Sequence, residues 1–87
     1  MDNEIQSLEQ LYKRVYPALT SKKRELNKTG YDYIKQKDIW EYLSNEKWIN
    51  TEGLDISTMV SDIFQADNKA IDNYLKDTLK KRSESDE

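Results

Sequence analysis

The 87-residue sequence contains no cysteine and no histidine, and these two absences remove several classes of function. Without cysteine the chain has neither a disulfide framework nor a thiolate zinc site. Without histidine it lacks the commonest general base and the commonest metal ligand, and two glycines alone cannot form a phosphate-binding glycine loop. The serines and threonines have no evident activating partner, so the sequence predicts a protein that is not an enzyme and holds no metal or cofactor.

Long apolar runs are also missing. No segment approaches the roughly 18 apolar residues of a membrane span, and the acidic, amphipathic start MDNEIQSLEQ is unlike a signal peptide. We therefore expect no membrane insertion and a cytoplasmic protein. Hydrophobic and charged residues each make up 36% of the chain, but the apolar ones recur in regular clusters, which favours one folded domain with a thin core.

Helix-breaking residues are scarce, and apolar residues recur with helical spacing along most of the chain. In the first part they follow alternating steps of three and four, and Lys22 occupies the one place in this stripe that is not apolar. Because proline removes a backbone hydrogen bond and clashes with the preceding turn, Pro17 predicts either a kink or a new helix start, and we favour two helices, about 3–15 and 17–28, that meet at a bend. The stripe consists of Ile5, Leu8, Tyr12, Val15, Leu19 and Leu26.

Three further helices are expected after this pair. Gly30 is suited to the left-handed conformation that ends a helix, and a short extended segment, YDYI, follows it. The next helix is predicted at about 36–46, with WINTEG as a loop after it. Asp55 is a good N-cap for the following helix, and Asp67 or Asn68 caps the last one.

The final five residues, SESDE, are polar and offer nothing to bury, so we expect them to form a disordered acidic tail. The sequence as a whole predicts an all-α fold. We expect the chain to form a single small domain of four to five short helices at residues 1–82, followed by the tail at 83–87.

Charge is distributed unevenly, although the net charge is only −3. Residues 13–47 hold nine basic and five acidic side chains, whereas residues 48–87 hold five basic and nine acidic ones. A DNA-reading helix-turn-helix would need a turn of about three or four residues and a recognition helix that tolerates phosphates. Here the loop is much longer and no Lys or Arg occurs between Trp48 and Lys69. Sequence-specific DNA binding is therefore not expected.

The basic middle of the chain is instead a candidate site for RNA. Cations hold the backbone of single-stranded RNA and aromatic rings stack on its bases, so lysines interleaved with tyrosines suit such a ligand. The same density of lysines is also typical of an ordinary solvated helix face, and no RRM or KH motif is present. The candidate RNA-binding residues are Lys22, Lys23, Arg24, Lys28, Tyr31, Tyr33, Lys35 and Lys37.

Three of the six tyrosines and both tryptophans fall within residues 30–48. Such large rings can fill the core of a lean domain, and they are also common at the centre of protein interfaces. We expect both tryptophans in or at the edge of the core, with Tyr31 or Tyr33 more exposed. The alternative function is a helical protein adaptor that takes a partner helix in a groove, with the acidic segment 48–68 selecting a basic partner. The candidate protein-interaction residues are Trp40, Trp48, Asp55 and Asp62.

Three segments, VYPALTSKKREL, GYDYIKQKDIWEYLSNEKW and ISTMVSDIF, carry a family resemblance over about residues 11–75. In order and spacing they resemble the ComN-type post-transcriptional regulators, small proteins of Gram-positive bacteria. The matching positions are Pro17 to Lys22, Gly30 to Asp32, Trp40 to Leu43 with Lys47 and Trp48, and Val60 to Ile63.

This resemblance implies control of gene expression at the level of messenger RNA in a bacterial cytoplasm, as in a competence regulator. It also implies recruitment to the septum or poles by a scaffold of the DivIVA kind, and it brings no catalytic residues and no RNA contacts to carry over. Two binding mechanisms stay open. The basic region 20–37 contacts RNA directly, or the domain is an adaptor that does not touch nucleic acid.

Overall fold

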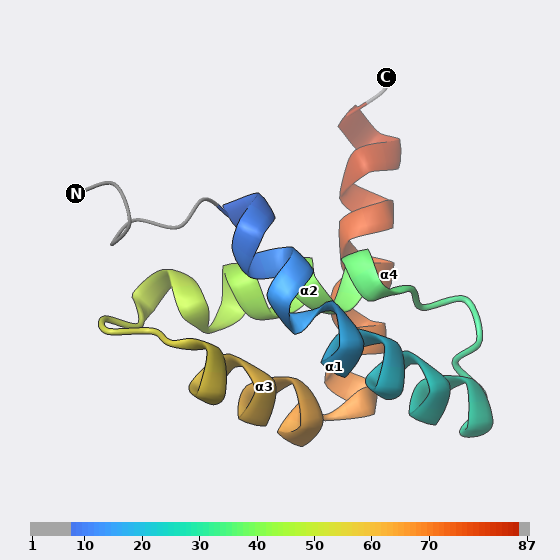
Figure 1. Ribbon diagram of the computed structural model, residues 1–87. Helices are drawn as coiled ribbons and strands as arrows, with labels where there is room; N and C mark the ends of the chain where they lie inside the picture. The colour runs from blue at the N-terminus through green and yellow to red at the C-terminus, as the bar shows by residue number, and fades with distance from the viewer. Residues whose placement is uncertain (1–7, 86–87) are drawn as a thin grey trace.

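The computed structural model describes residues 8–85, and in this range the chain forms four α-helices and one short 3₁₀ helix, without strands. The prediction of an all-α fold is confirmed. The helices are α1 (Leu8–Lys28), α2 (Gln36–Glu46), the 3₁₀ helix η2 (Trp48–Asn50), α3 (Ile56–Gln65) and α4 (Asn68–Ser85) (Figure 1).

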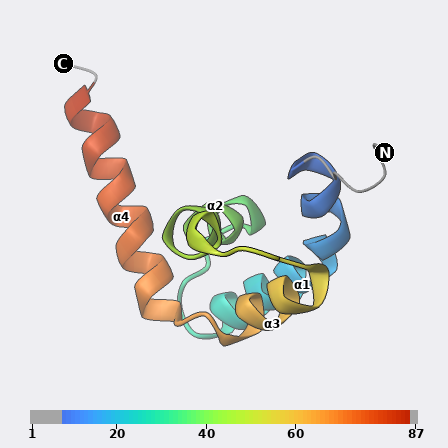
Figure 2. The same cartoon turned by 90° about the vertical axis from the view of Figure 1, so that its left-hand side faces the viewer.

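Helix α1 packs against both α2 and α3, and α2 lies between α1 and α4 (Figure 2). Helix α4 packs mainly against α2, and its C-terminal half extends away from the other helices. The core therefore lies where α1, α2 and α3 meet, and the first turns of α4 close one side of it.

The favoured division into two helices at Pro17 is wrong and the alternative, a kink, is correct, because α1 is one helix that contains this proline. The pyrrolidine ring is exposed, and so is Lys13, whose carbonyl loses its helical donor, so that water can take the donor's place. Val15 and Ala18, on either side of the proline, are buried and hold both parts of the helix on the core. Figure 2 shows that the axis of α1 changes direction along its length, so the proline bends the helix without ending it. Residues 3–7 of the predicted first helix lie outside the described range.

Helix α1 ends at Lys28, and Gly30 takes the left-handed conformation after it, as the sequence predicts. The glycine has φ +95°, and its N–H donates to the carbonyl of Asn27 at 3.4 Å. The N–H of Tyr31 donates to the carbonyl of Leu26 at 2.8 Å. These two bonds form a Schellman motif, which satisfies carbonyls that the helix end would otherwise leave without donors.

The N-terminal caps of the last two helices are also confirmed. The Asp55 carboxylate accepts a hydrogen bond from the backbone N–H of Thr58 at 2.8 Å, which caps α3. The Asp67 carboxylate accepts one from the backbone N–H of Ala70 at 2.9 Å at the start of α4.

Three helix boundaries and one loop can be compared directly with the predictions. Helix α2 has the predicted bounds, whereas the predicted loop WINTEG begins as the 3₁₀ helix η2. Helix α4 continues to Ser85, so residues 83–85, which we expected in a disordered tail, are helical. Residues 86 and 87 of that tail lie outside the described range.

Most apolar residues of the predicted helical stripes that lie within residues 8–80 are buried or half-buried, but three are exposed. Leu8, Phe64 and Leu79 are 72%, 48% and 52% exposed, because the helices run past the edge of the core at these positions. The core consists of Val15, Ala18, Leu19, Leu26, Ile34, Ile39, Leu43, Trp48, Met59, Ile63 and Ile71.

Candidate functional site

Five of the predicted RNA-binding residues are accessible cations on the second half of α1 and around the start of α2, and we call this set the basic end: Lys23, Arg24, Lys28, Lys35 and Lys37. Four of them are exposed and Lys23 is half-buried. Arg24 and Lys28 are one helical turn apart and therefore share a face of α1. The side-chain amide of Gln36 donates to the Thr20 hydroxyl at 3.3 Å, and this bond holds the start of α2, with Lys35 and Lys37 on either side of Gln36, beside the middle of α1.

The cations of the basic end have no carboxylate partner among the side chains of residues 8–80. Two of the nearby acids are already engaged elsewhere. Glu25 pairs with Lys22, and the Asp38 carboxylate accepts a hydrogen bond from the backbone N–H of Lys35 at 2.9 Å. Asp32 is exposed in the turn between α1 and α2. The surface therefore keeps a positive excess that is available to an anionic ligand.

Lys22, also a predicted RNA-binding residue, is 1% exposed and lies in the core, where a phosphate cannot reach it. Its position in the apolar stripe of α1 turns it toward the end of α3. The Lys22 ammonium donates to the carbonyls of Ala66 at 2.8 Å and Phe64 at 3.5 Å, and pairs with Glu25 at 3.3 Å. A cation at this place stabilises the negative end of the α3 dipole, so the role of Lys22 is structural.

The two candidate tyrosines differ in exposure. Tyr31 is half-buried and packs against the core, whereas Tyr33 is 46% exposed. The Tyr33 hydroxyl donates a hydrogen bond to the buried Asp72 carboxylate, which is also 3.1 Å from the Lys76 ammonium. The bond to Asp72 raises the pKa of Tyr33 to about 12 and lowers the pKa of Asp72. Tyr33 thus offers an exposed ring whose hydroxyl end is fixed to α4.

Four aromatic rings follow one another in edge-to-face contacts from the surface into the core. The ring centroids are 5.5 Å apart between Tyr16 and Tyr12, 5.2 Å between Tyr12 and Trp40, and 5.4 Å between Trp40 and Trp48. Trp48 is buried and Trp40 is half-buried. The prediction that both tryptophans lie in or at the edge of the core is confirmed.

Asp62, a predicted protein-interaction residue, is bound inside the molecule. It accepts a hydrogen bond from the Trp48 indole N–H at 2.8 Å and one from the Lys47 ammonium at 2.9 Å. Asp55 is exposed, but its carboxylate caps α3. The acidic segment 48–68 therefore offers less available negative charge than the sequence indicates. The bond between Trp48 and Asp62 joins residues 14 positions apart, and no local pattern in the sequence predicts it.

A hollow with mostly apolar walls, which we call the apolar groove, is bounded by the first turns of α1, by α2 and by the segment 48–54. Its volume is about 300 Å³, and Ser44, Asn45 and Met59 complete its lining. Leu8 and Ile49 at this groove are each 72% exposed. In the sequence Leu8 falls in an apolar helical stripe and Ile49 in a predicted loop, so no local pattern indicates this surface. The apolar lining consists of Leu8, Leu11, Trp40, Trp48, Ile49 and Leu54.

Among the side chains of residues 8–80, no three or more acidic groups are placed together to hold a metal ion. No helix in this part of the chain has both the length and the apolar character needed to cross a membrane.

Comparison with known proteins gives one relative and one family. No solved structure matches the chain. The post-transcriptional regulator ComN of Bacillus subtilis (strain 168) is 37% identical over 65 residues, which cover 74% of this chain and 66% of the relative. The sequence profile of the family described as "Post-transcriptional regulator" matches residues 8–86, nearly the whole chain. The chain therefore belongs to the post-transcriptional regulator family.

Proposed function

We propose that this family member acts by binding RNA directly at the basic end. The observation that carries the proposal is the set of accessible cations, none of which is paired with a carboxylate within the described residues. Segment 20–37, which contains them, has six basic and two acidic residues, and one of those acids, Glu25, is paired with Lys22. Exposed cations without carboxylate partners can replace the counterions of RNA phosphates without first breaking an internal ion pair.

Tyr33 is the better of the two candidate tyrosines for stacking on a base. Its ring is exposed, and its hydrogen bond to Asp72 holds it in place before RNA arrives, so that less side-chain freedom is lost on binding. Stacking on an aromatic ring contributes about 1–3 kcal/mol per base. Tyr31 packs against the core and has less of its ring available.

Binding of fluorescent single-stranded RNA, measured by anisotropy at several salt concentrations, tests this proposal. Contact with about four phosphates predicts a log–log salt slope near −3, since each phosphate contributes roughly −0.7. The double variant Arg24→Glu/Lys28→Glu should weaken binding at least about tenfold. The matched control, Lys69→Glu/Lys80→Glu, changes the net charge equally on exposed positions of α4. Equal loss in both variants, or no detectable binding by the unmodified protein at low salt, would contradict direct RNA contact at the basic end.

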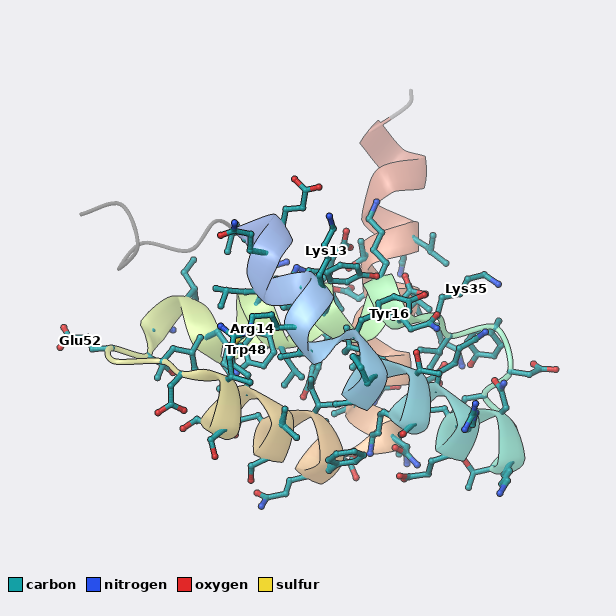
Figure 3. All side chains as sticks on the ribbon, in the orientation of Figure 1. Lys13, Arg14, Tyr16, Lys35, Trp48 and Glu52 are labelled. Atoms are coloured by element: carbon teal, nitrogen blue, oxygen red, sulfur yellow. The ribbon has the colours of Figure 1, made fainter. Side chains whose placement is uncertain are left out.

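A protein-adaptor role is the second candidate function, and the apolar groove is the observation that favours it. The groove and most of the basic end lie apart: Lys35 and Glu52 are at opposite ends of the view in Figure 3, and of the basic end only Lys37 lines a hollow beside the groove, with Leu8 and Trp40. One chain can therefore hold RNA and a protein partner together, and the two functions do not exclude each other. Recruitment by a scaffold protein stays a prediction from the family resemblance.

A further inference from the structure

Tyr16 on α1 presents a second aromatic ring to solvent. It is 41% exposed, close to the 46% of Tyr33. Its ring packs edge to face on Tyr12 with the centroids 5.5 Å apart, and this contact fixes the ring while much of it stays accessible. Unpaired bases of single-stranded RNA stack on rings of this kind.

The contacts on either side of Tyr16 place it beside the start of α2. One turn after Tyr16, the Thr20 hydroxyl accepts a hydrogen bond from the Gln36 side-chain amide at 3.3 Å. One turn before it, Tyr12 packs on Trp40 of α2 with the ring centroids 5.2 Å apart. Tyr16 therefore lies between two points at which α1 touches α2.

Two cations of the basic end, Lys35 and Lys37, lie at the first turn of α2, between the two exposed tyrosines. Tyr33 precedes Lys35 by two residues in the chain. On the other side, Lys37 lines a hollow together with Tyr12, the ring that contacts Tyr16. Tyr16 and Lys35 lie in the same half of the view in Figure 3. A strand that crosses the start of α2 thus meets a ring, two cations and a second ring, which are the elements that hold single-stranded RNA.

The charges along this path leave a small positive excess. The five cations of the basic end are opposed by three acids: Asp32, Asp38 and Glu41. Earlier on α1, Lys13 pairs with Glu9 at 3.8 Å, so these two charges offset each other. Arg14 is a further cation of this part of α1, already engaged in a contact within the chain. The path therefore attracts phosphates only moderately, and stacking on the rings has to supply part of the affinity.

We propose that Tyr16 is a second base-stacking residue, and that a single-stranded RNA segment crosses the first turn of α2 with one base on Tyr33 and another on Tyr16. This inference rests on the proposed function of the basic end. The ligand it specifies is RNA with at least two unpaired bases, because a base-paired helix keeps its bases stacked on one another and offers none to the rings.

Binding of fluorescent single-stranded RNA, measured by anisotropy, tests the second ring. Tyr16→Leu removes the ring but keeps an apolar side chain, and it should weaken binding at least about fivefold. The salt slope should stay unchanged, because no phosphate contact is lost. Tyr16→Phe keeps the ring and should bind like the unmodified protein. Phe64→Leu is the matched control, since Phe64 is a ring of similar exposure, 48%, on α3.

Two further measurements separate stacking from a structural effect. An abasic ribose-phosphate oligomer of the same length should bind equally to Tyr16→Leu and to the unmodified protein, because it has no base to stack. In the unmodified protein, RNA should shift the ring protons of Tyr16 upfield in NMR spectra, and this result does not depend on whether Tyr16→Leu folds. Unshifted ring protons, RNA binding by Tyr16→Leu as tight as by the unmodified protein, an equal loss in Phe64→Leu, or an equal loss with the abasic oligomer would each overturn the proposal.

The outcome for Tyr16 is distinguishable from the outcome for the basic end. If RNA binding depends on Arg24 and Lys28 but not on Tyr16, the second ring fails and the basic end remains the RNA site. If the unmodified protein binds no RNA at low salt, the proposed function fails and the role of Tyr16 fails with it.

Discussion

Replacing the buried Lys22 by methionine tests whether its ammonium, and not only its hydrocarbon stem, stabilises the fold. Methionine keeps most of the stem volume, so it creates little cavity. It removes the charged hydrogen bond of 2.8 Å to the Ala66 carbonyl and the longer one of 3.5 Å to the Phe64 carbonyl. Glu25 loses an ion pair but keeps its hydrogen bond from Asn68 at 3.1 Å.

The expected cost follows from these contacts. Loss of a hydrogen bond to a charged group that leaves a partly buried carbonyl without a donor costs about 1.5–3 kcal/mol. For a domain of this size, a decrease of about 2 kcal/mol in the free energy of unfolding lowers Tm by roughly 8–16 °C. Lys22→Ala removes the stem as well and should cost about 4 kcal/mol in total, which approaches the whole stability of a small domain, about 4–13 kcal/mol.

Urea unfolding followed by tryptophan fluorescence measures these free energies. Lys23→Met is the control, because Lys23 is only half-buried and forms no ion pair among the described residues. A Lys22→Met variant as stable as the unmodified protein to within about 0.5 kcal/mol would show that the ammonium does not stabilise the fold. Desolvation of the ammonium would then cancel its hydrogen bonds, as happens for some buried charges.

Two further predictions concern pH. The hydrogen bond from the Thr58 N–H holds the pKa of Asp55 below its usual value, so the cap stabilises α3 above the unfolded pKa and is lost as pH falls through the lower folded pKa. Asp55→Ala should therefore lower Tm at neutral pH, and the difference in Tm from the unmodified protein should disappear below about pH 4. Asp55→Asn keeps the hydrogen-bond acceptor and should change Tm less. If the difference in Tm between Asp55→Ala and the unmodified protein stays the same at acid pH, the charge of Asp55 does not contribute to the cap. Tyr33→Phe removes the main cause of the low Asp72 pKa, so carboxyl-carbon NMR should show that pKa rising toward its usual value; an unchanged titration would exclude the bond.

Local signals in the sequence were sufficient for the fold class, for α2 and for the caps. Asp55, Asp67 and Gly30 act on neighbours within five residues, and a backbone bond over such a distance can be recognised from residue type and position. Pro17 misled the prediction because the effect of a proline depends on which side of the helix it faces. On the solvent side the missing donor is replaced by water, and buried neighbours keep the helix continuous.

The candidate site was harder to predict because its residues are sorted by contacts far apart in the chain. Lys22 falls in the apolar stripe, which was a visible signal, but its carbonyl partners are 42 and 44 residues away. Asp62 looks like a surface acid until Trp48 and Lys47 are placed beside it. The apolar groove requires three separate segments to meet, and no spacing within one of them indicates that meeting.

The outer half of α4 has one further consequence. Beyond Leu75 this helix has few neighbours, and Lys76, Asp77, Leu79 and Lys80 are exposed. Its last turns can open without disturbing the remainder, so they add little to the cooperative unfolding unit. A fluorophore or fusion partner attached at that end would stand clear of both surfaces and could report on each of them while leaving the thermal transition of the domain nearly unaltered.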